Sequence, residues 1–279
     1  MVKRFFWIKQ QTADEHNDSA SAADNNVPQI MLLSGPPSCG KTSLLFQFAV
    51  NTVLEQGRDV VFICSKRRLE NKPPFLSQGL DPSSDIFQKI KMKYVEDDEE
   101  IKKYFAAFHM HCNNEGGTFP GAVIIDDFGE FFDDTNCKQR YGGNYRGRDL
   151  AVVRTLALCR DAILHANERL LLESSLVGGD KYSCKLLISD THLGDTPRSL
   201  FIYKRWVPSI FTIKPGDASG SYVLNSITSS NGASIIRSTG ATVEALASTT
   251  VSVAGRKKTA GCAKYSIALQ YLMLEDIIS

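Results

Sequence analysis

QIMLLSGPPSCGKTSLL, residues 29–45, is the stretch that decides the fold of this 279-residue chain. Its apolar start, from Ile30 to Leu33, is typical of a buried strand. The next residues, Gly35 to Thr42, fit the phosphate-loop pattern G-x-x-x-x-G-K-S/T without a mismatch. An amphipathic helix is predicted directly after this loop, with one buried face made of Leu45, Phe48, Ala49 and Thr52. A strand, a glycine-bearing turn and a helix in this order predict a polyphosphate site.

The residue types in this loop suit phosphate chemistry. Gly35 and Gly40 let the backbone curl so that successive N–H groups point at an anion, and the following helix adds the positive end of its dipole. Lys41 is expected on the β- and γ-phosphates of a nucleoside triphosphate, and the Thr42 hydroxyl on Mg²⁺. The predicted nucleotide-binding residues are Gly35, Pro36, Pro37, Ser38, Cys39, Gly40, Lys41, Thr42 and Ser43.

A second anchor of the site lies far downstream. The apolar run from Ala122 to Ile125 is a strand pattern that ends in Asp126 and Asp127. In phosphate-loop NTPases a carboxylate at a strand end holds Mg²⁺ opposite the loop hydroxyl, which is the Walker B arrangement. Asp126 is accordingly the predicted metal partner of Thr42. The long separation between the two motifs leaves room for further strand and helix units.

Two partial motifs beside Asp126 do not support other enzyme classes. Asp127, Phe128 and Gly129 spell the DFG of protein kinases, but neither a lysine strand nor an HRD loop precedes them. Residues 126–129 also fit the D-x-x-G of GTPases, yet no N-K-x-D follows to read guanine. A protein kinase and a GTPase are therefore not predicted.

Composition limits the remaining function classes. The formal net charge is +1, so any binding to nucleic acid has to come from local basic clusters. No run has the apolar core of a signal peptide or the length of a membrane span, which predicts a soluble, intracellular protein without membrane contact. The seven cysteines are scattered through expected strands and helices, as buried reduced thiols are.

The rest of the chain predicts a single α/β domain over residues 28–279, preceded by a disordered N-terminal tail, residues 1–27. At the start of that tail, FFWI (residues 5–8) is expected as a docking peptide or as an edge strand. Residues 65–74, SKRRLENKPP, are expected as a basic loop, and residues 216–260 as loose hairpins. Further strands are predicted at 59–64, 90–94, 185–190, 211–214 and 263–273, and helices at 95–112 and 149–172.

A basic and aromatic loop, DDTNCKQRYGGNYRGR (residues 133–148), follows the second anchor. Guanidinium groups suit phosphates, exposed tyrosines stack on bases, and glycines let a loop adapt. An ordinary solvated loop is the alternative reading of the same composition. The predicted DNA-binding residues are Arg140, Tyr141, Tyr145, Arg146 and Arg148.

The order of these parts resembles the RecA-type recombinase core, a mostly parallel twisted sheet flanked by helices with a β-rich C-terminal end. RYGGNYRGRDLAVVRTLALCRDAI (residues 140–163) is similar to the first DNA-binding loop and following helix of those recombinases. VVFICSKRRLENKPP (residues 60–74) resembles the recombinase paralogues that partner a SWIM-type zinc-finger protein in a Shu-type complex. The resemblance implies a nuclear protein of homologous recombination that binds ATP, Mg²⁺ and single-stranded DNA. It also implies a hetero-oligomer with that zinc-finger protein and with recombinase paralogues.

One position departs from the recombinases. They carry a glutamate just past the second strand to orient the attacking water, and Lys66 stands at that position here. A protonated lysine cannot act as that base, so Glu70 and Asp127 are the candidate catalytic residues, and hydrolysis is left open. An accessory protein with weak or absent turnover is the leading hypothesis. The alternatives are a DNA-stimulated ATPase, a small-molecule phosphotransferase and a purely structural partner.

Overall fold

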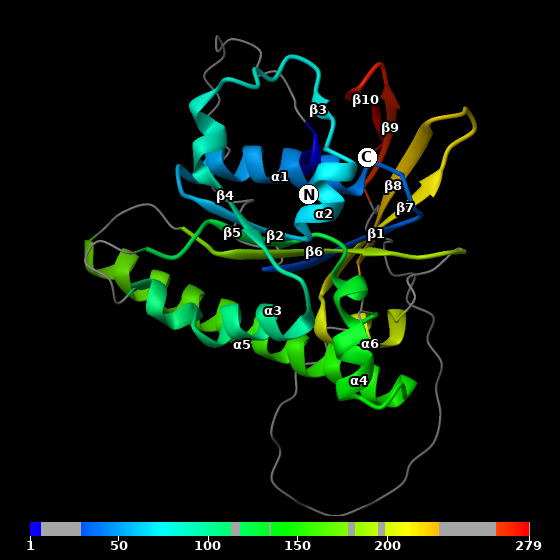
Figure 1. The fold of residues 1–279 in the computed structure, drawn as a ribbon. Helices are drawn as coiled ribbons and strands as arrows, with labels where there is room; N and C mark the ends of the chain where they lie inside the picture. Colours follow the sequence, from blue (N-terminus) through cyan, green and yellow to red (C-terminus); the bar gives the residue numbers. More distant parts are fainter. Residues whose placement is uncertain are drawn as a thin grey trace, which may run out of the picture.

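A computed structural model describes residues 1–6, 29–112, 118–133, 135–177, 182–194, 199–228 and 261–278. The centre of the molecule is a ten-stranded sheet with the order β3-β10-β9-β8-β7-β1-β6-β5-β2-β4 (Figure 1). The strands are β1 (Ile30–Gly35), β2 (Val60–Cys64), β3 (Leu76–Ser77), β4 (Ile90–Tyr94), β5 (Ala122–Ile125), β6 (Lys185–Thr191), β7 (Ser209–Pro215), β8 (Ser221–Thr228), β9 (Cys262–Ala268) and β10 (Tyr271–Ile278). The α-helices are α1 (Lys41–Gln56), α2 (Lys66–Asn71), α3 (Asp98–Ala106), α4 (Thr135–Arg140), α5 (Tyr145–Val177) and α6 (Leu200–Trp206).

The parallel half of the sheet runs from β7 through β1, β6, β5 and β2 to β4. Its central strands are apolar and buried because helices cover both faces, α1 on one face and α3 with α5 on the other (Figure 1). Each face has its own buried cluster: Phe48 of α1 belongs to one, and Ile163 of α5 to the other. The strands predicted at 59–64, 90–94, 122–125, 185–190 and 211–214 are confirmed. Parallel strands share one carboxyl edge, so the ends of β1 and β5 lie at the same edge of the sheet.

The C-terminal part of the sheet is antiparallel. β8 pairs with β7, β9 with β8, and β10 with β9. The prediction of one closing strand over residues 263–273 is wrong, because the chain turns at Leu269 and Gln270, both at positive φ, and forms a hairpin. β8 agrees with the hairpins expected over 216–260, and residues 229–260 lie outside the described residues.

The first residues of the chain belong to the core. They form a 3₁₀ turn, η1 (Val2–Phe5), so Phe5 is not in the expected edge strand; residues 7 and 8 of the FFWI segment lie outside the described residues. The Phe5 ring packs on Phe48 and Phe211, and Phe6 is also buried. Asn51 Nδ2 of α1 donates to the backbone carbonyls of residues 4 and 6, each at 2.9 Å. The fold therefore includes a segment before Pro28; residues 7–27 of the expected disordered tail lie outside the described residues.

Several segments expected as loops are helical. Residues 66–71 of the expected basic loop form α2. The expected loop over 133–148 contains α4 and the start of α5, which begins at Tyr145. Conversely, the helix expected over 95–112 ends at Ala106 and is followed by a 3₁₀ turn, η4 (Phe108–Cys112). None of the described helices, α5 included, is long and apolar enough to cross a membrane.

Candidate nucleotide-binding site

The phosphate loop lies between β1 and α1. β1 ends at Gly35, and α1 begins at Lys41, with Gly40 as its N-cap at φ +81°. Ser38 also has a positive φ, +59°. These left-handed positions turn the loop tightly over the start of the helix, where backbone N–H groups without helical partners are available to an anion. The predicted loop is therefore a tight turn that ends at the N-terminus of α1.

The Lys41 side chain stays with the loop. Its ammonium donates hydrogen bonds to the carbonyl oxygens of Gly35, at 3.2 Å, and Pro36, at 2.8 Å. The residue is buried to 8% exposure, which is unusual for lysine and fixes the charge beside the loop backbone. A cation is thus held where the loop would meet the β- and γ-phosphates.

The two predicted metal ligands are joined directly. Thr42 Oγ1 donates a hydrogen bond of 2.9 Å to Asp126 Oδ2. Ser189, on the intervening strand β6, donates to Asp126 Oδ1 at 2.8 Å. Burial is the main cause that raises the pKa of Asp126, and the hydrogen bond from Ser189 opposes it. A metal ion bound here would offset the unfavourable burial of the ionised Asp126 carboxylate.

This oxygen pair fits the donor set of Mg²⁺. Mg²⁺ is usually held by one or two protein oxygen ligands together with waters and substrate phosphates, not by a complete protein cage. Thr42 and Asp126 supply one hydroxyl and one carboxylate in that manner. The described part of the chain contains no cluster of three or more His, Cys, Asp or Glu residues that could hold a metal.

Asp127 is held by other groups. Its carboxylate accepts from the backbone N–H and the hydroxyl of Thr191, at 3.0 and 2.9 Å, and pairs with Arg68. Asp127 is 4% exposed and has a left-handed backbone, φ +54°. A carboxylate that already accepts two hydrogen bonds and an ion pair is poorly available to take a proton from water.

The other candidate catalytic position lies on α2. The carboxylate of Glu70 pairs with Lys66 one turn earlier at 3.8 Å, and both side chains are more than 60% exposed. The structure therefore joins Glu70 and Lys66 to each other rather than to Asp126. Arg68, which the sequence analysis did not select, is the α2 residue that reaches the acids: it pairs with Asp127 and with Glu130. Its only signal in the sequence is its place in the basic run Lys66–Arg68.

The β-rich end supports the phosphate loop. Tyr265 of β9 is fully buried, and its hydroxyl donates to the Cys39 carbonyl oxygen at 2.7 Å. A methyl group added at Gly40 would lie 2.5 Å from Ile267 Cδ1, also on β9. The antiparallel strands thus pack against the loop from residues more than 200 positions later in the chain, a contact that no local pattern indicates.

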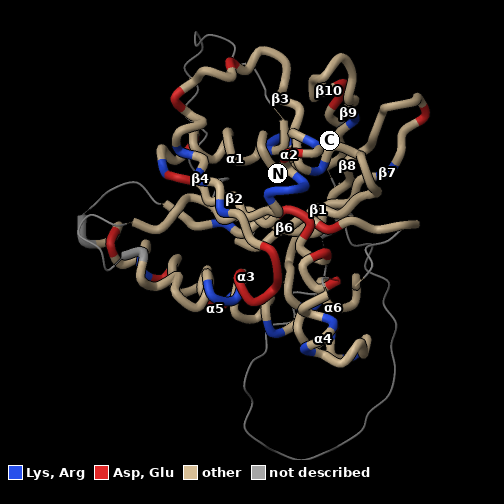
Figure 2. Tube along the Cα trace, viewed as in Figure 1, with Lys and Arg blue, Asp and Glu red and all other residues tan. Residues whose placement is uncertain are grey.

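The basic and aromatic segment, residues 135–148, is arranged differently from the predicted loop. Arg140 forms ion pairs with Asp97, at 3.2 Å, and with the fully buried Asp98 at the start of α3. Lys102 also pairs with Asp98 and donates to the Tyr141 hydroxyl at 3.0 Å. Figure 2 shows this acidic start of α3 beside the basic residues. The carboxylates of α3 therefore already satisfy much of the charge at Arg140.

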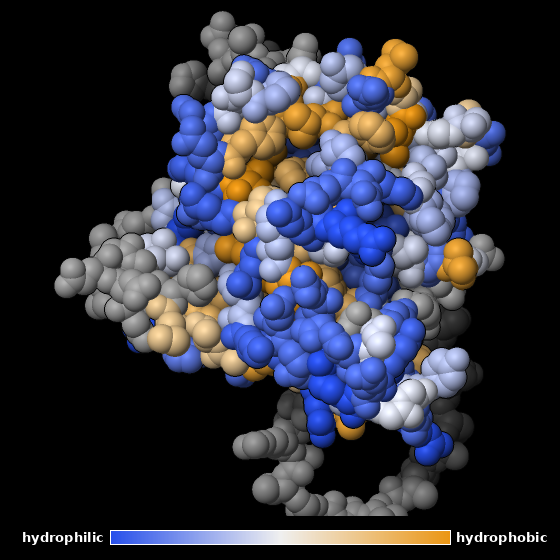
Figure 3. All heavy atoms as spheres, viewed as in Figure 1, coloured by the Kyte–Doolittle hydropathy of each residue, from blue (hydrophilic) through white to orange (hydrophobic). Residues whose placement is uncertain are grey.

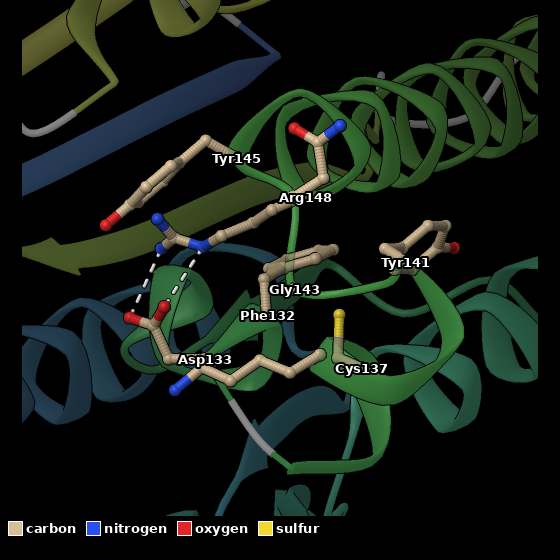
Figure 4. A pocket seen from close by; sticks show the side chains of 9 residues that line it. Phe132, Asp133, Cys137, Tyr141, Gly143, Tyr145 and Arg148 are labelled. Carbon is tan, nitrogen blue, oxygen red and sulfur yellow. Dashed lines mark hydrogen bonds and ion pairs between the residues drawn. The ribbon is translucent and has the colours of Figure 1, made fainter.

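Arg148 is also paired, whereas two neighbours are exposed. Its guanidinium pairs with Asp133 at 3.1 and 3.2 Å. This ion pair lines a cavity of about 130 Å³, which Tyr141 and Tyr145 also line (Figure 4). The Tyr145 side chain is 83% exposed, and Arg146 is exposed as well. Hydrophilic side chains cover α2, α4 and the start of α5 on this side of the molecule (Figure 3).

Comparison with known proteins adds one distant relative. No protein-family model matches the sequence. The human (Homo sapiens) protein ATPase SWSAP1 is 30% identical over 101 residues. The aligned part covers 36% of this chain and 41% of that protein, so the similarity extends over less than half of either.

Proposed function

We propose that this chain is an ATP-binding protein with a RecA-like core that serves as an accessory factor in homologous recombination. The observation that carries the nucleotide site is the 2.9 Å hydrogen bond between Thr42 and Asp126. It brings the phosphate loop and the strand-end acid together although they lie far apart in the sequence. The similarity to a protein named as an ATPase supports the same assignment.

In the proposed complex, residues 35–43 hold ATP and Mg²⁺. The loop backbone and Lys41 bind the phosphates, while Thr42 and Asp126 hold Mg²⁺, which neutralises phosphate charge. The nucleotide acts as a structural or switching ligand rather than as fuel. The ion pair between Asp127 and Arg68, and the exposure of Lys66 and Glu70, support this lack of turnover.

A double-mutant cycle tests the shared metal site. Thr42→Ala and Asp126→Asn are each expected to weaken Mg²⁺-dependent ATP binding by about tenfold, as measured by calorimetry. The double variant is expected to lose little more than either single variant, because both side chains act on one ion. Thr118→Ala, at an exposed position, is the control. Fully additive losses, or no loss, would contradict the site.

The same proposal covers DNA and partners. Single-stranded DNA would meet the exposed Tyr145 and Arg146, through base stacking and phosphate contact. The resemblance further suggests a nuclear hetero-oligomer with a SWIM-type zinc-finger protein and recombinase paralogues. Affinity purification of the tagged full chain from nuclear extract is expected to recover such proteins. Their absence from repeated purifications would contradict the accessory role.

A further inference from the structure

One arginine of α2, Arg68, lies beside the acidic residues that follow β5. Arg68 of α2 forms ion pairs with Asp127 and Glu130, which lie in the segment after β5. It also interacts electrostatically with Asp126, the proposed metal ligand. Its planar guanidinium has donors for two carboxylates at once, which a lysine ammonium does not offer in fixed geometry.

The acids explain why a cation is held there. Asp126, Asp127 and Glu130 lie within five residues of one another, and the pKa values of Asp126 and Glu130 are raised by burial and, to a lesser extent, by the neighbouring carboxylates. Asp127 is buried, and a buried carboxylate without a partner is strongly unfavourable. Arg68 supplies a permanent positive charge, because guanidinium stays protonated throughout the physiological pH range. The acidic segment is therefore partly neutralised by the chain itself.

We propose that Arg68 is an internal counter-ion that competes with Mg²⁺ and sets a low metal affinity at this site. This inference rests on the nucleotide site proposed above. Two effects act in the same direction: the positive charge repels a divalent cation near Asp126, and the ion pair withholds Asp127 from waters around the metal. ATP binding then needs a higher Mg²⁺ concentration to reach its full affinity.

The test is a Mg²⁺ titration of the full-length protein with a fluorescent ATP analogue. Arg68→Gln is expected to lower the Mg²⁺ midpoint for analogue binding by about tenfold, because one nearby positive charge is removed. Arg68→Lys keeps the positive charge but not the paired donors, so it is expected to lower the midpoint less than Arg68→Gln does. Arg67→Gln, at the exposed neighbouring arginine, is the matched control and is expected to leave the midpoint unchanged within about twofold.

A second variant does not depend on removing the arginine. Glu130 is exposed, so Glu130→Gln is expected to fold, and it leaves the Arg68 charge with one counter-charge fewer. Its Mg²⁺ midpoint is expected to rise. An unchanged or raised midpoint in Arg68→Gln, a lysine variant that behaves like the glutamine variant, or a fall in Glu130→Gln would overturn the proposal.

The same titration separates this inference from the nucleotide assignment. If the analogue fails to bind the wild-type chain with Mg²⁺ and with EDTA, both the nucleotide site and the role of Arg68 are overturned. If it binds but the midpoint does not move in Arg68→Gln, only the role of Arg68 is overturned. Binding that strengthens as Mg²⁺ is added, together with the expected shift in Arg68→Gln, supports both.

Discussion

The phosphate loop and the basic segment over residues 135–148 were both predicted to bind ligands, and the structure treats them differently. In the loop, Lys41 and Thr42 lie beside the backbone and the acid that their roles require. In the basic segment, Arg140 and Arg148 are bonded to carboxylates of the same chain. The two predicted metal ligands, Thr42 and Asp126, are in contact, whereas only part of the predicted DNA surface is exposed.

The difference follows from what each motif uses. A phosphate loop binds mainly through backbone N–H groups, whose direction depends on local dihedral angles and on nearby glycines. An arginine cluster binds through long side chains, whose availability depends on any carboxylate that the fold brings near. The acids at the start of α3 are such a case, and they are about forty residues from Arg140 in the sequence.

The largest expected effect is at the loop lysine. Lys41→Ala is expected to weaken ATP binding by about 100-fold, because charge-assisted hydrogen bonds to phosphate are lost. Calorimetry with and without Mg²⁺ measures the change, and Lys72→Ala, at the exposed C-cap residue of α2, is the control. Equal ATP affinities for wild type and Lys41→Ala would contradict the assignment of the phosphate loop as an ATP site.

The next largest effect is expected at Asp98, the buried acid that pairs with Arg140 of the basic segment. Asp98→Asn is expected to lower the free energy of unfolding by about 2–3 kcal/mol, because a fully buried carboxylate pairs with Arg140 and Lys102. Glu99→Gln, at a 39% exposed carboxylate with the same partners, is expected to cost under about 1 kcal/mol. Denaturant unfolding measures both, and equal costs would show that burial of Asp98 is not what matters.

A comparison of Gly40→Ala with Gly57→Ala distinguishes the effect of backbone strain from the effect on ATP binding. Gly40 and Gly57 both have a left-handed backbone, so either alanine variant is expected to lose about 1 kcal/mol of stability. Only Gly40→Ala is expected to weaken ATP binding as well, because its added methyl group meets Ile267 while that of Gly57 meets nothing within 4 Å. Similar ATP affinities in the two variants would contradict the support of the loop by β9.

The smallest effect is expected on the basic segment. Arg146→Ala is expected to reduce affinity for single-stranded DNA several-fold and to lower its salt dependence, because an exposed phosphate contact is lost. Arg148→Ala is expected to have less effect on DNA, since Asp133 already binds that side chain. Fluorescence anisotropy at several salt concentrations compares the two. A larger loss with Arg148→Ala would mean that its ion pair opens for DNA.

Much of the sheet was predictable because continuous apolar runs indicate buried parallel strands. Asp126 was found by the same reasoning, since it follows such a run directly. The ion pairs of Arg68 could not be predicted from such a local pattern. The resemblance to recombinases put Lys66 where they carry a glutamate. In the structure Lys66 begins α2 and pairs with Glu70, while Arg68, two residues later, pairs with Asp127.

The sequence by itself determined the phosphate loop, the acid at the end of β5 and the apolar strands that carry them, because these signals are local in the chain. Only the tertiary structure decided which charges remain available: Arg68 is placed among the acids of the site, and Arg140 is placed against Asp98. Ion pairs depend on distance in space and on burial, and neither can be read from spacing in the sequence. Support of Gly40 by Ile267 is likewise a contact between distant parts of the chain.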